Sequence, residues 1–305
     1  MAHINVGIFG DTDQTLAKKL AKAGTINDIA IYNHASSEGV FSYVCPNSDK
    51  LQPILQVVGM IDFPIVIFRA LTKEFAEQMV AVDAARFEHG FIVADGVPEE
   101  QIKQVIKGSS LERFTLLGND PNEIRQAVIR ANVKRAEGDP WLPIDNYFEV
   151  KGVGTVALTI VQQGKVKKYD TLRVEPLGKE VMIKGMQSQD RDIVESESGM
   201  RLGVNLKGTD SEELKRGYVI CKSAIVAKSV KIKFTKSKYS REELTKGASV
   251  FISCGLQVIA ATLADTGSVL TLALERPLAY QAGEKCIISS TKQTLPRIIG
   301  FGIIE

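Results

Sequence analysis

The chain has 305 residues, of which 44% are hydrophobic and 24% charged, and its formal net charge is +2. This length suits two or three folded domains, and the composition is that of an ordinary globular protein, which excludes fibrous and disordered classes. The scattered cysteines, the three histidines, the short apolar runs and the plain N-terminus predict a reduced, cytoplasmic protein without a zinc site, redox motif, signal peptide or membrane span.

The first 136 residues alternate between short apolar segments and amphipathic ones. The apolar segments indicate strands that are buried on both faces; they lie at residues 4–10, 28–34, 40–46, 63–68, 90–95 and 113–119. Helices are predicted at residues 15–24, 48–56, 71–87, 98–108 and 120–136, the last with Asp120 as its cap. This alternation predicts a doubly wound parallel sheet with helices on both faces.

The character of the sequence changes after residue 136. Residues 137–145 (EGDPWLPID) are rich in turn formers and are predicted to be an interdomain linker. The segments that follow are short strand-like runs separated by glycine and aspartate turns, which favours barrels or sandwiches. Residues 209–217 are the one helix-like piece. We therefore expect three domains, at residues 1–136, 137–224 and 225–305.

Residues 147–220 carry a specific and ordered set of motifs. Glycines recur where hairpins and close backbone approaches need them. The motifs are Gly152–Val156, Gly164–Val166, Asp170–Thr171, Pro176–Gly178, Gln187–Arg191, Gly199, Gly203, Lys207–Gly208 and Glu213–Gly217. This block resembles the second domain of translational GTPases of the elongation factor Tu type, most nearly SelB, and residues 296–304 resemble the last strand of the family's third domain. The resemblance implies a GTPase-like α/β domain followed by two β-barrels.

The front of the chain departs from the family pattern. Where a phosphate-binding loop is expected, the sequence reads IFGDTDQTLAKKL, with Gly10, Asp11, Thr12, Asp13, Gln14 and Thr15 but no second glycine and no lysine. The switch II motif is missing around Cys45, and Asp95 is at best a remnant of the guanine-reading motif. GTP and magnesium are the family's ligands, but without these motifs we expect no bound cofactor, no metal and no catalytic residue. The loop is interpreted as a degenerate P-loop, and its two aspartates would repel phosphate.

The resemblance also implies a pocket for the aminoacyl end of tRNA between the first two domains. Position by position, Glu195, Gly199, Arg201 and Gly203 fall at this pocket, where Met200 replaces a usual aspartate. The alternative is that Glu195 is one more solvated charge. Asp190, Arg191 and Asp192 are interpreted as part of a strand and turn, and Cys45 as a packed side chain.

The third predicted domain is basic. Residues 225–305 hold 11 Lys or Arg and 6 Asp or Glu, and an uninterrupted basic run is formed by Lys228, Lys231, Lys233, Lys236, Lys238 and Arg241. Lys231 and Lys233 share one face of a predicted strand, where they could follow an RNA backbone. The alternative is an edge strand whose lysines prevent aggregation.

Two classes of function follow, with a third kept open. The first is a monomeric SelB-like paralogue that binds aminoacyl-tRNA or other RNA of the translation machinery, with the ribosome as a further partner, and that hydrolyses GTP poorly or not at all. The second is a divergent GTP-dependent elongation factor that delivers a specialised aminoacyl-tRNA. The third is a pseudo-GTPase scaffold that binds protein. Missing motifs favour the first.

Overall fold

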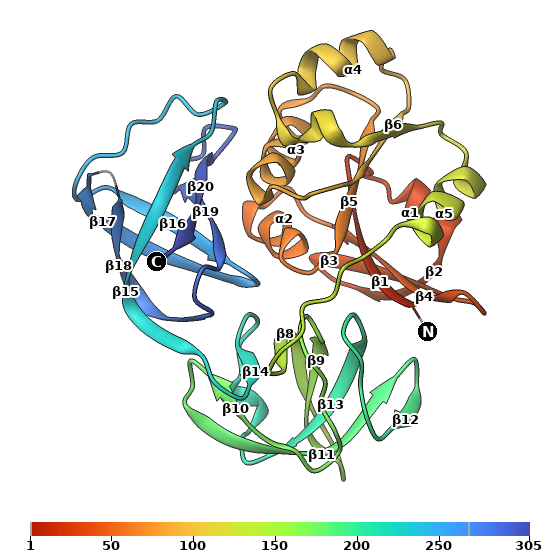
Figure 1. The fold of residues 1–305 in the computed structure, drawn as a ribbon, viewed down its shortest axis with the longest axis vertical. Helices are drawn as coiled ribbons and strands as arrows, with labels where there is room; N and C mark the ends of the chain where they lie inside the picture. Colours follow the sequence, from red (N-terminus) through yellow and green to blue (C-terminus); the bar gives the residue numbers. More distant parts are fainter. Residues whose placement is uncertain (1, 268) are drawn as a thin grey trace.

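The computed structural model describes residues 2–267 and 269–305, which form three β-sheet units around a common centre (Figure 1). The first is an α/β unit with a seven-stranded sheet in the order β2-β3-β4-β1-β5-β6-β7. Its strands are β1 (Ala2–Phe9), β2 (Lys22–Ile26), β3 (Ile29–Ala35), β4 (Gly39–Pro46), β5 (Phe63–Phe68), β6 (Phe91–Ala94) and β7 (Thr115–Leu117). Its helices are α1 (Thr15–Leu20), α2 (Leu51–Val58), α3 (Lys73–Ala85), α4 (Glu99–Ile106) and α5 (Pro121–Arg130), with a 3-10 turn η1 (Ser110–Arg113).

Helices cover both faces of this sheet, as predicted. In β5, Val66 and Phe68 pack toward α2 and α3, whereas Ile65 and Ile67 pack toward α1 and α5. Strands β4, β1, β5, β6 and β7 are parallel, but β3 runs antiparallel to β4 and β2 antiparallel to β3. The sheet is therefore mixed, and its parallel part is the one that places loops at a common carboxyl edge.

Two barrels follow the α/β unit, which confirms the predicted fold class. The middle barrel contains β8 (Trp141–Val150), β9 (Gly154–Ile160), β10 (Thr171–Glu175), β11 (Lys179–Ser188), β12 (Arg191–Ile193), β13 (Arg201–Lys207) and β14 (Val219–Cys221). Pairing of β10 with β11 closes a ring of six strands, and β12 is attached outside it. The C-terminal barrel closes in the order β15-β18-β17-β16-β19-β20, with β15 (Ile225–Lys236), β16 (Ser249–Cys254), β17 (Gln257–Thr266), β18 (Leu270–Tyr280), β19 (Lys285–Ser290) and β20 (Ile298–Ile304).

Four local predictions were wrong. The helix predicted at residues 120–136 ends at Arg130. The first helix ends at Leu20, and the next residues form β2 because their backbone pairs with β3. Trp141 is not in the linker but is buried at the start of β8, so the linker ends at residue 140. The helix-like segment at 209–217 is only a 3-10 turn, η2 (Ser211–Glu213), with a capping box between Asp210 and Glu213.

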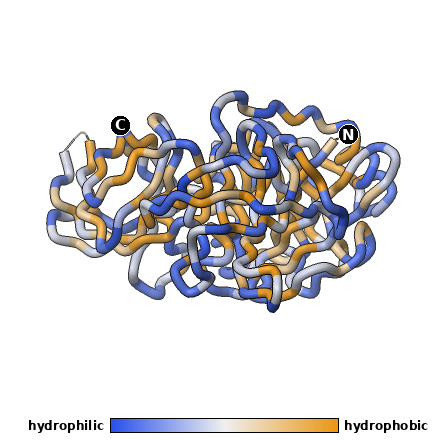
Figure 2. The backbone as a smooth tube through the Cα atoms, turned by 90° about the horizontal axis from the view of Figure 1, so that it is seen from below, coloured by the Kyte–Doolittle hydropathy of each residue, from blue (hydrophilic) through white to orange (hydrophobic). Residues whose placement is uncertain are grey.

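The three units share buried contacts. One hydrophobic cluster joins α2 and α3 to Leu256, Ile287 and Ile298 of the C-terminal barrel and to Ile160 of the middle barrel. Figure 2 shows that hydrophobic segments run mainly through the interior, with many hydrophilic loops outside. Among the described residues, no helix is both long and apolar enough to cross a membrane.

Candidate functional site: a filled nucleotide loop and an interdomain groove

The loop after β1 lies at the carboxyl edge of the parallel strands, where α/β folds bind their ligands. Gly10 has a φ of 81°, and a Cβ there would lie 2.3 Å from the Ile67 carbonyl oxygen, so no other residue fits. Its backbone N–H donates to Gln78 Oε1 at 2.8 Å. Gln14 also has a left-handed backbone, and its side chain bonds with Asn47 and the Tyr32 hydroxyl. The loop is therefore hydrogen-bonded to its surroundings through the side chains of Gln78 and Gln14.

Asp11 accepts hydrogen bonds from the backbone at the start of α1. Its carboxylate is 4% exposed and accepts hydrogen bonds from three backbone N–H groups at the start of α1, those of Thr15, Leu16 and Ala17, at 3.0, 2.8 and 3.2 Å. Free N–H groups of this kind are what a nucleotide-binding loop offers to phosphate oxygens. We expected Asp11 to repel phosphate through its charge. In the structure, its carboxylate also accepts hydrogen bonds from the three N–H groups.

A second set of polar contacts links Asp11 to neighbouring strand ends. Arg69, directly after β5, donates from Nε to Asp95 Oδ2 at 2.7 Å and lies 3.7 Å from Asp11 Oδ1. Asp95, directly after β6, also accepts from Asn119 Nδ2 at 2.8 Å. The hydrogen bond to Asp95 raises the pKa of Arg69. Asp95, the proposed remnant of a guanine-reading motif, is therefore bound to protein groups.

The loop does not fit GTP and magnesium. The cavity beside it is only about 160 Å³, whereas ligand pockets typically measure about 300–1,000 Å³. In the described part of the chain, two carboxylates and no cation line it; the lining residues are Ile8, Asp11, Thr12, Pro46, Asn47, Ser48, Asp49 and Gln78. Asp13 is exposed and adds a further negative charge nearby. Thr12 and Ser48 also line this cavity, but a tetra-anion would meet two carboxylates and no cation among its described lining residues.

A larger groove of about 630 Å³ separates the β2–β3 hairpin from the middle barrel. Its lining is mixed: Phe148, Val156, Leu158 and Met186 are apolar, and 42% of Phe148 is exposed. The polar lining residues include Gln187, Gln189, Asp190 and Asp192. Arg201 lies in it and forms an ion pair with Asp145, with side chains only 13% and 6% exposed. The groove therefore combines an aromatic face with a buried cation.

Three side chains of the groove carry buried polar atoms that have no partner within the described chain. They are Thr159 Oγ1, Arg201 Nη1 and Asn205 Oδ1. Buried polar groups are normally satisfied, so such a concentration indicates a place for a polar ligand or water. The sequence did not single out Thr159 or Asn205, which fall within ordinary alternating strands.

The residues predicted for the aminoacyl pocket divide into two groups. Arg201 and Gly203 line the groove. Glu195 does not line the groove. Its backbone forms a bridge with Lys167, whose Nζ lies 3.6 Å from the Glu195 carboxylate. The Glu195 side chain is half-exposed, as a solvated charge would be. Gly199 is packed against the α/β unit, where its carbonyl oxygen accepts from Asn5 Nδ2 at 2.9 Å.

The basic strand is β15, and the predicted alternation is present. Lys231 and Lys233 are exposed, whereas Val230 and Ile232 point into the barrel core. In the closed barrel, β15 pairs with β18 along residues 225–232 and with β20 along residues 232–236, so it is not the free edge of an open sheet. Lys228, Lys236 and Arg241 are also exposed.

Lys238 differs from the other members of the basic run. Its ammonium donates to the carbonyl oxygen of Lys107 at the end of α4 and lies 4.7 Å from the Tyr239 ring centre. It therefore joins the C-terminal barrel to the α/β unit and is not a free basic side chain.

Comparisons with known proteins agree with this architecture. Residues 154–221 match the family model described as elongation factor Tu domain 2. The chain is 32% identical to an uncharacterized protein of Methanocaldococcus jannaschii over 99% of both chains. It is 34% identical to the selenocysteine-specific elongation factor of that organism, covering 86% of this chain and 66% of the other.

A solved structure extends the likeness to the whole chain. The translation elongation factor SelB of Methanococcus maripaludis, in complex with the GTP analogue GppNHp, superposes with a TM-score of 0.87 at 20% identity, covering 100% of this chain and 79% of that one. The fold, the domain-two match and the relatives lead to one conclusion: the chain belongs to the elongation factor Tu and SelB-like family of translational GTPases.

Proposed function

We propose that this protein is a SelB-like translation factor paralogue that binds aminoacyl-tRNA, or another RNA of the translation machinery, without a GTP-driven cycle. One observation carries the proposal: Asp11 fills the cradle at the start of α1 that a nucleotide phosphate needs. The contacts of Gly10 and Asp95 and the small cavity support it. The working compartment of such a factor is the cytoplasm, where tRNA and ribosomes are found.

The RNA-binding part rests on two surfaces. The groove offers Phe148 for stacking and Arg201, Thr159 and Asn205 for polar recognition, which suits the end of an RNA strand bearing an acyl group. The exposed face of β15 offers lysines for a phosphate backbone. A ligand that enters the groove and also crosses the C-terminal barrel has to be a macromolecule.

The test of the nucleotide part is isothermal titration with GTP, GDP and a non-hydrolysable GTP analogue in the presence of magnesium. The proposal expects no heat of binding at high protein concentration. Guanine-selective binding at micromolar affinity or tighter would refute it and favour the divergent GTP-dependent elongation factor.

The test of the RNA part is the salt dependence of binding to aminoacylated and deacylated tRNA. Lys231→Gln and Lys233→Gln should each lower the slope of log K against log salt by about one. Lys19→Gln, an exposed lysine of the α/β unit, is the matched control and should leave the slope unchanged. If no tRNA binds at low salt, the protein-binding scaffold becomes the better hypothesis.

A further inference from the structure

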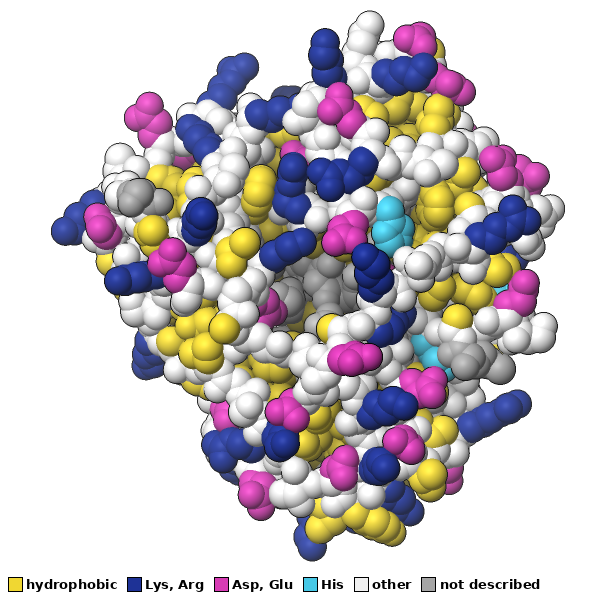
Figure 3. All heavy atoms as spheres, in the orientation of Figure 1, with side chains coloured by type: hydrophobic (Ala, Val, Ile, Leu, Met, Phe, Trp, Pro, Cys, Tyr) yellow, Lys and Arg dark blue, Asp and Glu magenta, His cyan; other side chains and the backbone are white. Residues whose placement is uncertain are grey.

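A third cavity lies where all three units meet. It measures about 500 Å³, within the range of small-molecule pockets. The ends of α2 and α3 form one side, residues 132–135 and the end of β9 a second, and strands β16 and β19 of the C-terminal barrel the third. Figure 3 shows a hollow at the centre of this face, bordered by Lys and Arg side chains and also by Asp or Glu side chains.

The lining of this junction cavity has an apolar part and a basic part. Leu55, Met60, Phe87, Ile160 and Ile287 come from all three units and provide apolar and aromatic surface. The charged lining residues are Asp62, Arg86, Glu88, Lys134, Arg135 and Lys285, so cations outnumber acids by four to two. A ligand with an apolar body and an anionic group would match both parts.

Two of the cations are already used. Arg135 forms an ion pair with Asp62. Arg86 Nη1 lies 3.1 Å from Asp83 Oδ1, and the Arg86 guanidinium carbon lies 5.2 Å from the Phe301 ring centre. Both arginines are therefore held by contacts within the protein. The basic lining residues that remain for an anionic ligand are Lys134 and Lys285.

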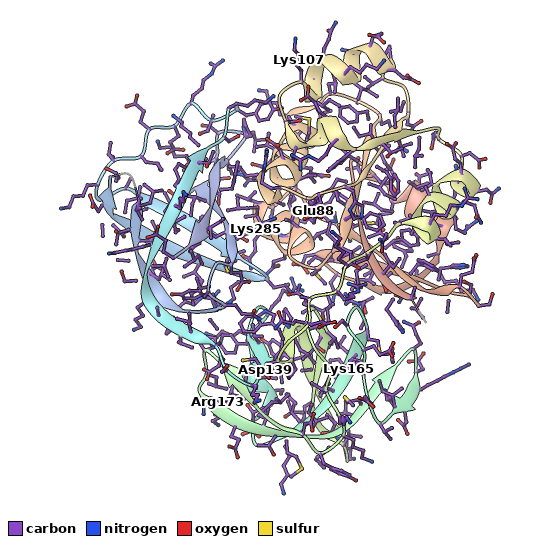
Figure 4. All side chains as sticks on the ribbon, viewed as in Figure 1. Glu88, Lys107, Asp139, Lys165, Arg173 and Lys285 are labelled. Carbon is purple, nitrogen blue, oxygen red and sulfur yellow. The ribbon has the colours of Figure 1, made fainter. Side chains whose placement is uncertain are left out.

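Lys134 and Lys285 are the remaining cations. Within the described chain, neither has a carboxylate within 4.0 Å. Lys285 Nζ donates only a long hydrogen bond, 3.4 Å, to the Arg86 carbonyl oxygen. Figure 4 shows Lys285 on the barrel side and Glu88 on the α/β side of the same opening. His89, another lining residue, has a buried Nε2 with no partner in the described chain.

We propose that the junction cavity binds a small organic anion, a carboxylate or phosphate group on a flat apolar body. Lys134 and Lys285, which are both exposed, hold the anionic group, and the body packs against Phe87 and its apolar neighbours. This site is separate from the groove and from the β15 face, so it does not depend on RNA binding. Because its occupant touches all three units, binding would stabilise their arrangement.

The probe is 8-anilinonaphthalene-1-sulfonate, an aromatic anion whose fluorescence rises in apolar surroundings. The full-length protein should bind one equivalent saturably, and Lys285→Glu or Lys134→Glu should weaken binding about tenfold by placing a negative charge beside the sulfonate. Lys246→Glu, an exposed lysine elsewhere in the C-terminal barrel, is the matched control and should change nothing. Circular dichroism of each variant confirms that it is folded, and Lys285→Gln replaces any variant that is not.

Displacement experiments identify the anionic group. Release of the probe by pyrophosphate but not citrate assigns a phosphate ligand, and the reverse assigns a carboxylate ligand. Four results would overturn the proposal. They are no saturable binding, equal binding by the lysine variants, failure of both anions to displace the probe, and loss of binding in Phe148→Asp, which would place the probe in the groove.

Discussion

The ion pair between Glu77 and Arg297 offers the most direct test of how the units are held together. Glu77 lies on α3 and Arg297 directly before β20, and their side chains are 2% and 13% exposed. The Arg297 backbone N–H and Nε each donate to Glu77 Oε1 at 2.9 Å, and a further guanidinium N–H donates to Oε2. Glu77→Ala removes every one of these acceptors and leaves a buried cation without its counter-charge.

Removing one partner of a buried ion pair costs about 3–5 kcal/mol. With a urea m value of about 3 kcal/mol/M, the unfolding midpoint should fall by about 1–1.7 M. The assay is urea unfolding followed by circular dichroism, together with hydrogen exchange at α3 and β20. Exchange should increase at both elements, because they form the two sides of the contact.

The matched control is Glu100→Ala. Glu100 pairs with Lys103 at 2.8 Å, but these side chains are 83% and 60% exposed. The free energy of unfolding should therefore change by well below about 1 kcal/mol in Glu100→Ala. If Glu77→Ala shifts the midpoint no more than Glu100→Ala does, the buried pair does not hold the barrel to the α/β unit. A double-mutant cycle with Arg297→Ala should give a coupling energy of about 1–3 kcal/mol.

Three further predictions concern Asp11, the Asp28–Arg216 pair and Cys45. Asp11→Ala leaves three N–H groups without an acceptor and should destabilise the protein by about 1–3 kcal/mol in urea unfolding, whereas the exposed Asp13→Ala should be nearly neutral. Hydrogen bonding from Arg216 lowers the pKa of Asp28, so this pair stabilises the fold above the pKa of the unfolded carboxyl and loses that effect as the pH falls. The difference in melting temperature between wild type and Arg216→Met should therefore shrink below about pH 4. A difference that stays constant with pH would contradict this prediction. Burial raises the pKa of the Cys45 thiol, which is 1% exposed, so iodoacetamide at pH 8 should leave it unmodified until urea unfolds the chain.

The sequence predicted the layers of the fold because the relevant signals are local. Unbroken short apolar runs such as residues 63–68 indicate strands covered on both faces, and the glycine and aspartate turns after residue 146 limit strand length. Strand β2 was missed because all five of its residues are exposed, so no burial pattern distinguishes it from a helix extension. Its conformation is determined by pairing with β3.

The candidate site was less predictable because its contacts connect distant parts of the chain. The sequence placed Asp11 where a phosphate-binding motif was expected, but it did not reveal that the Asp11 carboxylate accepts hydrogen bonds from the start of α1. Arg69 and Asp95 are 26 residues apart and meet only because β5 and β6 are neighbours. An arginine directly after a buried strand was the one available signal. Similarly, Lys238 resembled its basic neighbours until the fold placed it against Lys107.

The hydrophobic cluster shared by the units also bears on how the chain is synthesised. The apolar faces of α2 and α3 leave the ribosome early, but Ile298, which covers part of them, is added about 210 residues after the end of α3. At about 5–20 residues per second, this interval lasts roughly 10–40 s. During that time the nascent chain exposes the part of this surface that its C-terminal barrel later covers. Until the barrel folds onto it, that surface is open to any other apolar surface in its surroundings, a chaperone or a second nascent chain included.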